Sequence, residues 1–197
     1  VTVYLDGSGN ATIVAADVDN GSTDNCTSVT LAASPTAFTC SDVGTNNVTL
    51  TVTDGQGNTS TAVAVVTVAD TTSPTATAQN VTVYLDGSGN ATIVAADVDN
   101  GSGDNCGTVS LAIDVSAFSC TEIGANNVIL TVTDANSNTS TATAVVTIAD
   151  TTSPAAIAQN ITVYLDASGS ASIVAADVDN GSGDNCGTVS LAIDVSA

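Results

Sequence analysis

The chain of 197 residues contains no Lys, Arg or His and 20 acidic residues, so its formal net charge at pH 7 is −20. Nucleic acids and anionic membranes are bound mainly through Lys and Arg, and this composition excludes that mode of binding. It also excludes a Ser-His-Asp triad, a lysine Schiff base and a histidine metal site. We therefore expect no enzyme. We also expect no direct membrane span, which needs about 18 continuous apolar residues.

Alternation of apolar and polar residues predicts β-strands along the first part of the chain. The pattern is clear in five segments: residues 1–5, 11–16, 29–33, 48–53 and 62–68. Two further short strands fit residues 38–46. Segments rich in Asp, Asn and Gly separate the strands and favour turns, notably residues 6–10, 17–26 and 54–58. The pattern predicts an all-β fold, a β-sandwich of the immunoglobulin-like (Ig-like) type.

The pattern returns with a period of 80 residues: Val1 to Asp6 return as Val81 to Asp86, and again at residues 161–166. A fixed period of this kind predicts tandem copies of one domain. We expect repeat 1 at residues 1–80 with a linker at 71–80, repeat 2 at 81–160 with a linker at 151–160, and a truncated repeat 3 at 161–197. An odd number of strands would place the two ends of each sandwich opposite one another, so the repeats would stack end to end as a rod.

Each complete copy contains two cysteines 14 residues apart, which predicts a disulfide within the copy. We expect Cys26 to pair with Cys40, and Cys106 with Cys120. Each bond would contribute about 3 kcal/mol in the chain-entropy model, and disulfides indicate an oxidising, extracellular setting. Cys186 would need a partner at position 200, so we interpret the sequence as a window on a longer repeat polymer. The alternative is a neighbouring chain that donates the missing strands.

One half of the repeat resembles a known module. The run from Phe38 to Val68, with Val43-Gly44 followed by Val48-Thr-Leu-Thr-Val-Thr-Asp54-Gly-Gln-Gly-Asn58, is similar to hyalin-repeat (HYR-type) modules. The loop Thr23-Asp24-Asn25 and the opening Asp70-Thr-Thr-Ser-Pro74 fit the same pattern. The whole unit resembles tandem Ig-like repeats of large secreted or surface proteins of Bacteroidota. The resemblance covers the entire chain and implies an adhesive or spacer module without an active site.

Acidic residues gather at the predicted strand ends. End-to-end stacking would bring Asp6 and Asp70 towards Asp97, Asp99, Asp104 and Asp134 of the next repeat. Crowded carboxylates repel one another, and Ca²⁺ is the cation that Asp and Asn oxygens suit best. We therefore predict Ca²⁺ at these junctions, as in cadherin-like arrays, or else Asp residues that only form turns and keep the chain soluble. The candidate ligands are Asp6, Asp17, Asp19, Asp24, Asp54, Asp70, Asp97, Asp99, Asp104, Asp134 and Asp150.

Covalent glycans are the second predicted modification. The acceptor motif Asn-x-Ser/Thr occurs at Asn10, Asn20, Asn25, Asn47, Asn58, Asn80, Asn90, Asn100, Asn138, Asn160 and Asn180. A second motif, Asp-Thr-Thr, resembles the O-glycosylation signal of Bacteroidota and offers Thr71, Thr72, Thr151 and Thr152. All four threonines lie in the predicted linkers.

These features favour a structural role: a secreted, disulfide-stabilised and glycosylated rod that forms a surface stalk or filament, with itself as the main partner. One alternative is an adhesin that recognises carbohydrate or another cell through outward-facing Tyr4, Tyr84 and Tyr164. Another is a pilus-like polymer of short subunits that exchange strands. Threonine ladders such as the one in residues 49–53 would also suit ice or mineral binding, although Thr is a strong strand former in any case.

Overall fold

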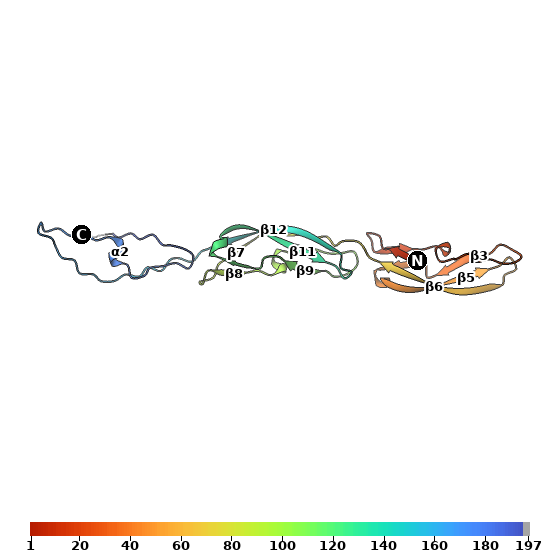
Figure 1. Cartoon of the computed structure of the whole chain (residues 1–197). Coiled ribbons are helices and arrows are strands. Elements are labelled where there is room, and N and C mark those ends of the chain that lie inside the picture. Colours follow the sequence, from red (N-terminus) through yellow and green to blue (C-terminus); the bar gives the residue numbers. More distant parts are fainter. Residues whose placement is uncertain (195–197) are drawn as a thin grey trace. The chain divides into compact units, whose positions relative to one another are not determined.

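The computed structural model describes residues 1–194 and shows an all-β chain (Figure 1). The first repeat contains six strands and two short 3-10 helices. They are β1 (Thr2–Tyr4), β2 (Asn10–Thr12), η1 (Ala15–Asp17), β3 (Thr30–Ser34), β4 (Ala37–Thr39), η2 (Cys40–Asp42), β5 (Gly44–Thr53) and β6 (Thr59–Ala69). A four-stranded sheet in the order β1-β6-β5-β3 faces the pair β2-β4.

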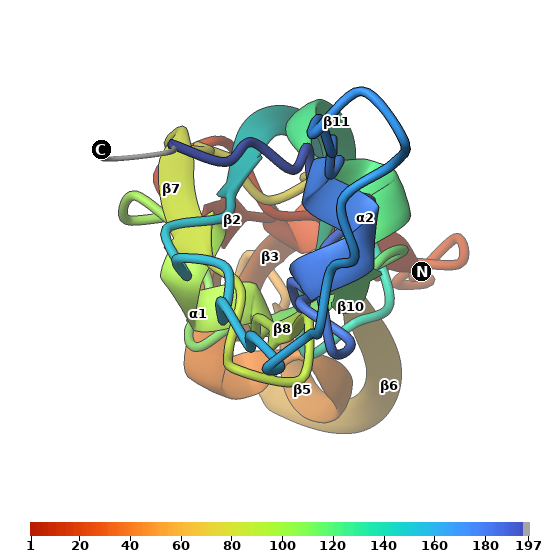
Figure 2. The ribbon, with the colours of Figure 1, turned by 90° about the vertical axis from the view of Figure 1, so that its left-hand side faces the viewer.

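β5 and β6 form a long antiparallel hairpin, and Figure 2 shows the two strands side by side. Gly44 lies opposite Val68 at one end, and Thr53 lies opposite Thr59 at the other. β1 runs parallel to β6, so the first and last strands of the repeat point in the same direction. We expected the first and last strands to run in the same direction because we expected an odd number of strands. The direction is as expected, but the repeat has six strands.

The predicted strand at residues 11–16 is too long. β2 ends at Thr12, and η1 follows because the Asp17 carboxylate accepts a hydrogen bond from the backbone amide of Val14 at 2.7 Å. A side chain that bonds the backbone three residues earlier favours a turn over a continued strand.

The second repeat has the same arrangement, with sheet order β7-β12-β11-β9 and the pair β10-β8. Its elements are β7 (Val81–Tyr84), β8 (Asn90–Thr92), α1 (Ala95–Val98), β9 (Ser110–Ile113), β10 (Ala117–Ser119), η3 (Cys120–Glu122), β11 (Gly124–Thr133) and β12 (Thr139–Ala149). Over residues 150–194 the structure contains the one-turn helix α2 (Ala175–Val178) and isolated β-bridges, with no strand.

The core of the first repeat lies between its two sheets. Phe38 on β4 packs with Val48 on β5 and with Val66 and Val68 on β6, and all four are at least 98% buried. Full burial of such a side chain contributes about 1.5–3 kcal/mol. The protein is therefore built from β-sandwiches of the predicted class.

The compact units of the chain cross the boundaries of the sequence repeats. The first unit comprises Val1–Ala78, Asp99–Ala112 and Leu130–Ala142, and the second comprises Gln79–Val98, Ile113–Ile129 and Thr143–Ala197. The first repeat thus shares a unit with two segments of the second. The domain limits at residues 80 and 160 remain predictions.

Candidate metal centre and disulfides

The two disulfides connect consecutive sequence repeats. Within the first compact unit Cys40 is bonded to Cys106, and within the second unit Cys120 is bonded to Cys186. Each bond joins residues 66 positions apart, with Cα atoms separated by 5.2 Å. The predicted pairs Cys26–Cys40 and Cys106–Cys120 are therefore wrong. Cys26 is a free, exposed thiol.

The strand order explains why Cys26 and Cys40 cannot meet. Cys40 directly follows β4, which pairs with β2 next to the turn at residues 6–10. Cys26 lies beside the opposite turn, because the neighbouring Thr27 hydroxyl accepts a hydrogen bond from the Gly55 amide at 3.1 Å. The 11 residues of β6 lie between these two ends, a span of about 33 Å.

A glycine leaves room for each disulfide. Gly9 has a φ of +76°, and a Cβ atom at this position would press against the Cys40 sulfur. Gly89 repeats the arrangement in the second unit, where a Cβ atom would lie 2.5 Å from the Cys120 sulfur. Gly169 has a similar φ of +77°, but a Cβ atom there would meet nothing within 4 Å.

We expect Gly9→Ala to lower the free energy of unfolding by about 2–3 kcal/mol and Gly169→Ala by only about 1 kcal/mol. Both substitutions put an alanine at positive φ, but only the one at residue 9 also crowds a disulfide. Chemical denaturation measures the two losses, and thiol titration should find additional free thiol only in Gly9→Ala. Equal losses for the two variants would show that the close approach to Cys40 has no energetic weight.

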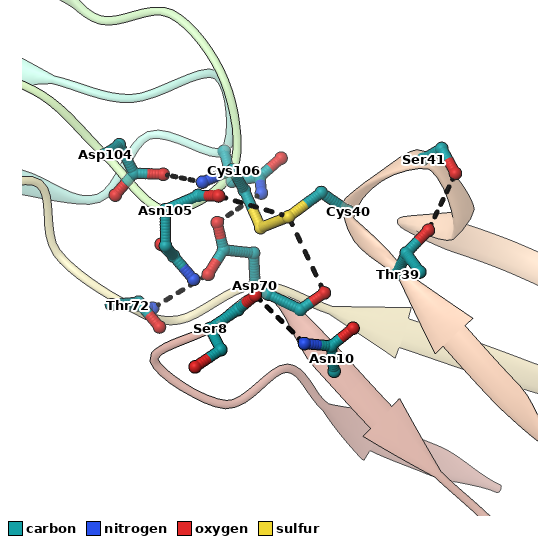
Figure 3. The surroundings of a disulfide bond; sticks show 12 residues. Ser8, Asn10, Thr39, Cys40, Ser41, Asp70, Thr72, Asp104, Asn105 and Cys106 are labelled. Carbon is teal, nitrogen blue, oxygen red and sulfur yellow. Dashed lines mark hydrogen bonds between the residues drawn. A yellow bond between two sulfur atoms is a disulfide. The ribbon is translucent and has the colours of Figure 1, made fainter.

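Three carboxylates form a cluster, and Figure 3 shows two of them, Asp70 and Asp104, beside the first disulfide. Oxygen atoms of Asp70, Asp104 and Asp134 lie within 4.8 Å of one another. Asp70 and Asp134 are each 93% buried, since only 7% of their surface is accessible. The chain has no Lys or Arg to neutralise them. Each pair of charges at this separation costs about 3 kcal/mol at an effective dielectric constant of about 20.

Local hydrogen bonds hold Asp134 in place. Its Oδ1 accepts hydrogen bonds from the backbone amides of Asn136 and Asn138, both at 2.8 Å, and its Oδ2 accepts one from the Asn138 side chain. Burial raises the pKa of Asp134, but these hydrogen bonds outweigh burial and leave that pKa below its ordinary value. The carboxylate therefore stays charged at neutral pH.

Asp70 is tied to the same turn. Its Oδ2 accepts a hydrogen bond from the Asn136 side chain at 3.1 Å, and its Oδ1 accepts one from the Thr72 amide at 3.0 Å. Asp104 Oδ2 accepts one from the amide of Cys106 at 2.8 Å, so the disulfide holds this carboxylate close to the other two.

Two buried oxygens near this cluster have no hydrogen-bond partner. They are Oδ1 of Asp104 and the side-chain oxygen of Asn105, whose amide group donates to the Asp6 carbonyl at 3.1 Å. The second unit repeats the arrangement, because Asp184 Oδ1 and the Asn185 oxygen are also buried without a partner. A buried oxygen without a donor carries a cost of about 1–3 kcal/mol, which a bound cation would offset.

The donor set suits a hard cation. It consists of three carboxylates, and a set of oxygen donors fits Ca²⁺ better than a transition metal. The buried Asn105 oxygen is a further candidate ligand. A hollow of about 410 Å³ bordered by Thr72, Ser73, Asp104 and Asn105 opens beside it and gives a hydrated ion access.

The other predicted calcium ligands lie outside this group. Asp6 caps the turn at residues 6–10 by accepting hydrogen bonds from the Ser8 and Asn10 amides. Asp97 accepts from the Val94 amide, and Asp99 accepts from the Gly101 amide. Local turns also engage Asp17, Asp19, Asp24, Asp54 and Asp150. Of the carboxylates expected to approach one another, the structure groups Asp70, Asp104 and Asp134, and Asp6, Asp97 and Asp99 are not part of this group.

The predicted glycosylation sites lie mostly at the surface. Thr71, Thr151 and Thr152 are exposed, and Thr72 is half-buried. All the asparagine acceptors are exposed except Asn138, which is half-buried and bonded to Asp134. The modification itself remains a prediction.

The fold and its disulfides define a class of protein, the tandem β-sandwich repeats in which covalent bonds join successive copies. No family model matches the chain, and no curated protein matches it. No helix within residues 1–194 is long and apolar enough to cross a membrane.

Several solved structures are similar to parts of the chain. The human mucin-like protocadherin EC1-2 is 14% identical, with coverage of 76% of this chain and 95% of that chain and a TM-score of 0.38. The fibronectin(III)-like modules of Clostridium thermocellum CbhA are 14% identical, with coverage of 75% and 89% and a TM-score of 0.29. An endo-fucoidan hydrolase from glycoside hydrolase family 107 is 15% identical, with coverage of 63% and a TM-score of 0.26, and the chain spans only 24% of it. These likenesses are too weak to bear on function.

Proposed function

We propose that the protein is an extracellular structural repeat that forms a surface stalk or filament. The observation that carries this proposal is the disulfide from one repeat to the next, at Cys40–Cys106 and again at Cys120–Cys186. A bond within a repeat would stabilise only that repeat, whereas a bond between repeats resists their separation under load. Disulfides persist in oxidising compartments, which supports a location outside the cell.

In this proposal, Ca²⁺ at Asp70, Asp104 and Asp134 stiffens the connection between repeats, and glycans coat the exposed linkers. The ion would neutralise three crowded carboxylates that otherwise repel one another. Each connection would then be held by a covalent bond and by an ion. Such a design suits a protein that supplies length and stiffness.

The intact mass of native material, denatured and reduced, tests the structural role. We expect a mass well above the 19.1 kDa of this sequence, which falls to a multiple of one repeat after sugar removal. A mass of 19.1 kDa would contradict a continuous filament and favour short subunits that exchange strands.

One observation favours an adhesive role as the second candidate. Tyr4, Tyr84 and Tyr164 recur once per repeat and are 62%, 61% and 85% exposed, as expected for outward-facing side chains. Tyrosine is enriched at the surfaces through which proteins bind one another. Loss of cell or carbohydrate binding in a triple Tyr→Ser variant would support this role.

A further inference from the structure

The first repeat has a surface groove. It has a volume of about 340 Å³ and is lined by Val18, residues 20–22, Leu50 and residues 62–64. Val18 and Ala64 are half-buried, whereas their counterparts 80 residues later, Val98 and Ala144, are fully buried. We call the open groove of the first repeat the acceptor groove.

The linker between the repeats pairs with residues 100–103, the counterparts of residues 20–23 beside the groove. Thr75 exchanges two backbone hydrogen bonds with Gly103, at 2.7 and 3.1 Å, and the Asn100 amide donates to the Thr77 carbonyl at 2.9 Å. The Thr77 amide in turn donates to the Ser102 hydroxyl at 3.0 Å. An extended segment that pairs its backbone with an exposed edge is a common mode of peptide recognition.

The same backbone pairing recurs in the third repeat. Ala155 exchanges two hydrogen bonds with Gly183, at 2.7 and 3.0 Å, and the Asn180 amide donates to the Ile157 carbonyl at 2.8 Å. Ala155 and Ile157 take the places of the threonines at 75 and 77. Because the side chains differ while the bonds persist, the backbone carries most of this contact.

The corresponding loop of the first repeat makes no such pairing in the part of the chain that the structure describes. Within residues 1–194 the isolated bridges include none at Asp19 or Thr23, the counterparts of Asp99 and Gly103. Cys26 is a free thiol, whereas its counterpart Cys106 is bonded. The free thiol and one side of the groove, Val18 and residues 20–22, belong to the same loop, residues 17–26. The two other copies of this loop each bind a preceding linker and a preceding cysteine.

We infer that the acceptor groove binds a further copy of the linker sequence, residues 70–80, presented by another repeat of this kind. The inference deepens the proposed function and rests on it, because it identifies the surface through which repeats join in series. The occupant must be extended and must leave its backbone free to pair, as residues 75–77 do.

An extension of the full chain tests this inference. The eleven residues of the 70–80 sequence are placed directly before Val1, just as Asn80 directly precedes Val81. We expect amide hydrogen exchange at Asn20 and Thr23 to slow by roughly tenfold or more. The exchange rates of Asn100 and Gly103 in the same molecule serve as the internal reference for a covered groove.

An extension with the same eleven residues in scrambled order is the control. Slower exchange with the native order alone supports the inference. Unchanged exchange with the native order overturns it, and equal protection by both extensions overturns the assignment of the linker as the occupant. The exchange experiment does not depend on the intact mass of native material. A groove that does not bind the linker can therefore be distinguished from a protein that does not form a filament.

Discussion

Replacing Cys40 and Cys106 together with Ser is expected to lower the free energy of unfolding of the first compact unit by about 4 kcal/mol. The bond closes a loop of 66 residues, and the chain-entropy model gives this magnitude for such a loop. Removing both cysteines prevents a replacement bond between Cys26 and whichever partner remains. Chemical denaturation of the oxidised proteins measures the difference.

Cys26→Ser is the matched control. Cys26 has the same place in its repeat as Cys106 but is free and exposed, so its replacement is expected to change stability by less than about 0.5 kcal/mol. A loss as large as that of the double variant would mean that Cys26 and Cys40 are bonded instead. That result would restore the pairing predicted from the sequence.

The second disulfide can be checked by cleavage at Glu122, which is the one glutamate in the chain. A glutamate-specific protease should separate residues 1–122 from residues 123–197. The Cys120–Cys186 bond keeps the two fragments together until a reductant is added. A bond between Cys106 and Cys120 would let them separate without reduction.

The long strands were predictable because their side chains alternate strictly. Residues 48–53 and 62–68 fall within β5 and β6, and they contribute Val48, Val66 and Val68 to the core. Burial of one face determines the register of such strands, since a shift by one residue would expose the whole apolar set. The sandwich class follows directly from this pattern.

The disulfides were not predictable in the same way. Their partners depend on which end of the sandwich each cysteine occupies, and the pairing of β2 with β4 decides this for Cys40. Both strands have only three residues, too few for alternation to define a partner. A short separation in sequence therefore pointed to Cys26, although the fold places that residue at the opposite end.

The carboxylate cluster was partly predictable. Strand direction alone places Asp70 near Asp104 and Asp134, and the structure brings their oxygens within 4.8 Å. Asp6, Asp97 and Asp99 were grouped with them because strand direction shows only at which end of the sandwich a carboxylate lies, and not how close its oxygens come to those of another. Asn105 was missed as a candidate ligand, although an Asp-Asn-Cys triplet at 24–26, 104–106 and 184–186 marks its position in every copy.

Calcium is expected to raise the unfolding temperature of the oxidised protein, and Asp134→Asn is expected to abolish that increase. A ligand at about 100 times its dissociation constant stabilises the folded state by about 2.7 kcal/mol. Removal of one of three carboxylates takes away a charged ligand on which Ca²⁺ binding depends. Thermal unfolding at neutral pH, in excess Ca²⁺ and in excess EDTA, measures the effect.

Asp54→Asn provides the control, because Asp54 caps its own turn in the way that Asp134 does. Its Oδ1 accepts hydrogen bonds from the Gln56 and Asn58 amides at 2.8 Å, and its Oδ2 accepts one from the Asn58 side chain, as Asp134 does in its own turn. Both substitutions therefore weaken the same set of hydrogen bonds within a turn. Of these two aspartates only Asp134 belongs to the carboxylate cluster among the described residues, so Asp54→Asn should keep the calcium response.

The change in stability that Asp134→Asn causes without calcium separates the two roles of Asp134, which caps a turn and belongs to the carboxylate cluster. In EDTA the three carboxylates repel one another, so Asp134→Asn should lose less stability than Asp54→Asn and can even gain some. In Ca²⁺ the order should reverse, because only the wild-type cluster binds the ion. An identical response of the two variants under both conditions would mean that Asp134 serves its turn alone and that the cluster binds no calcium.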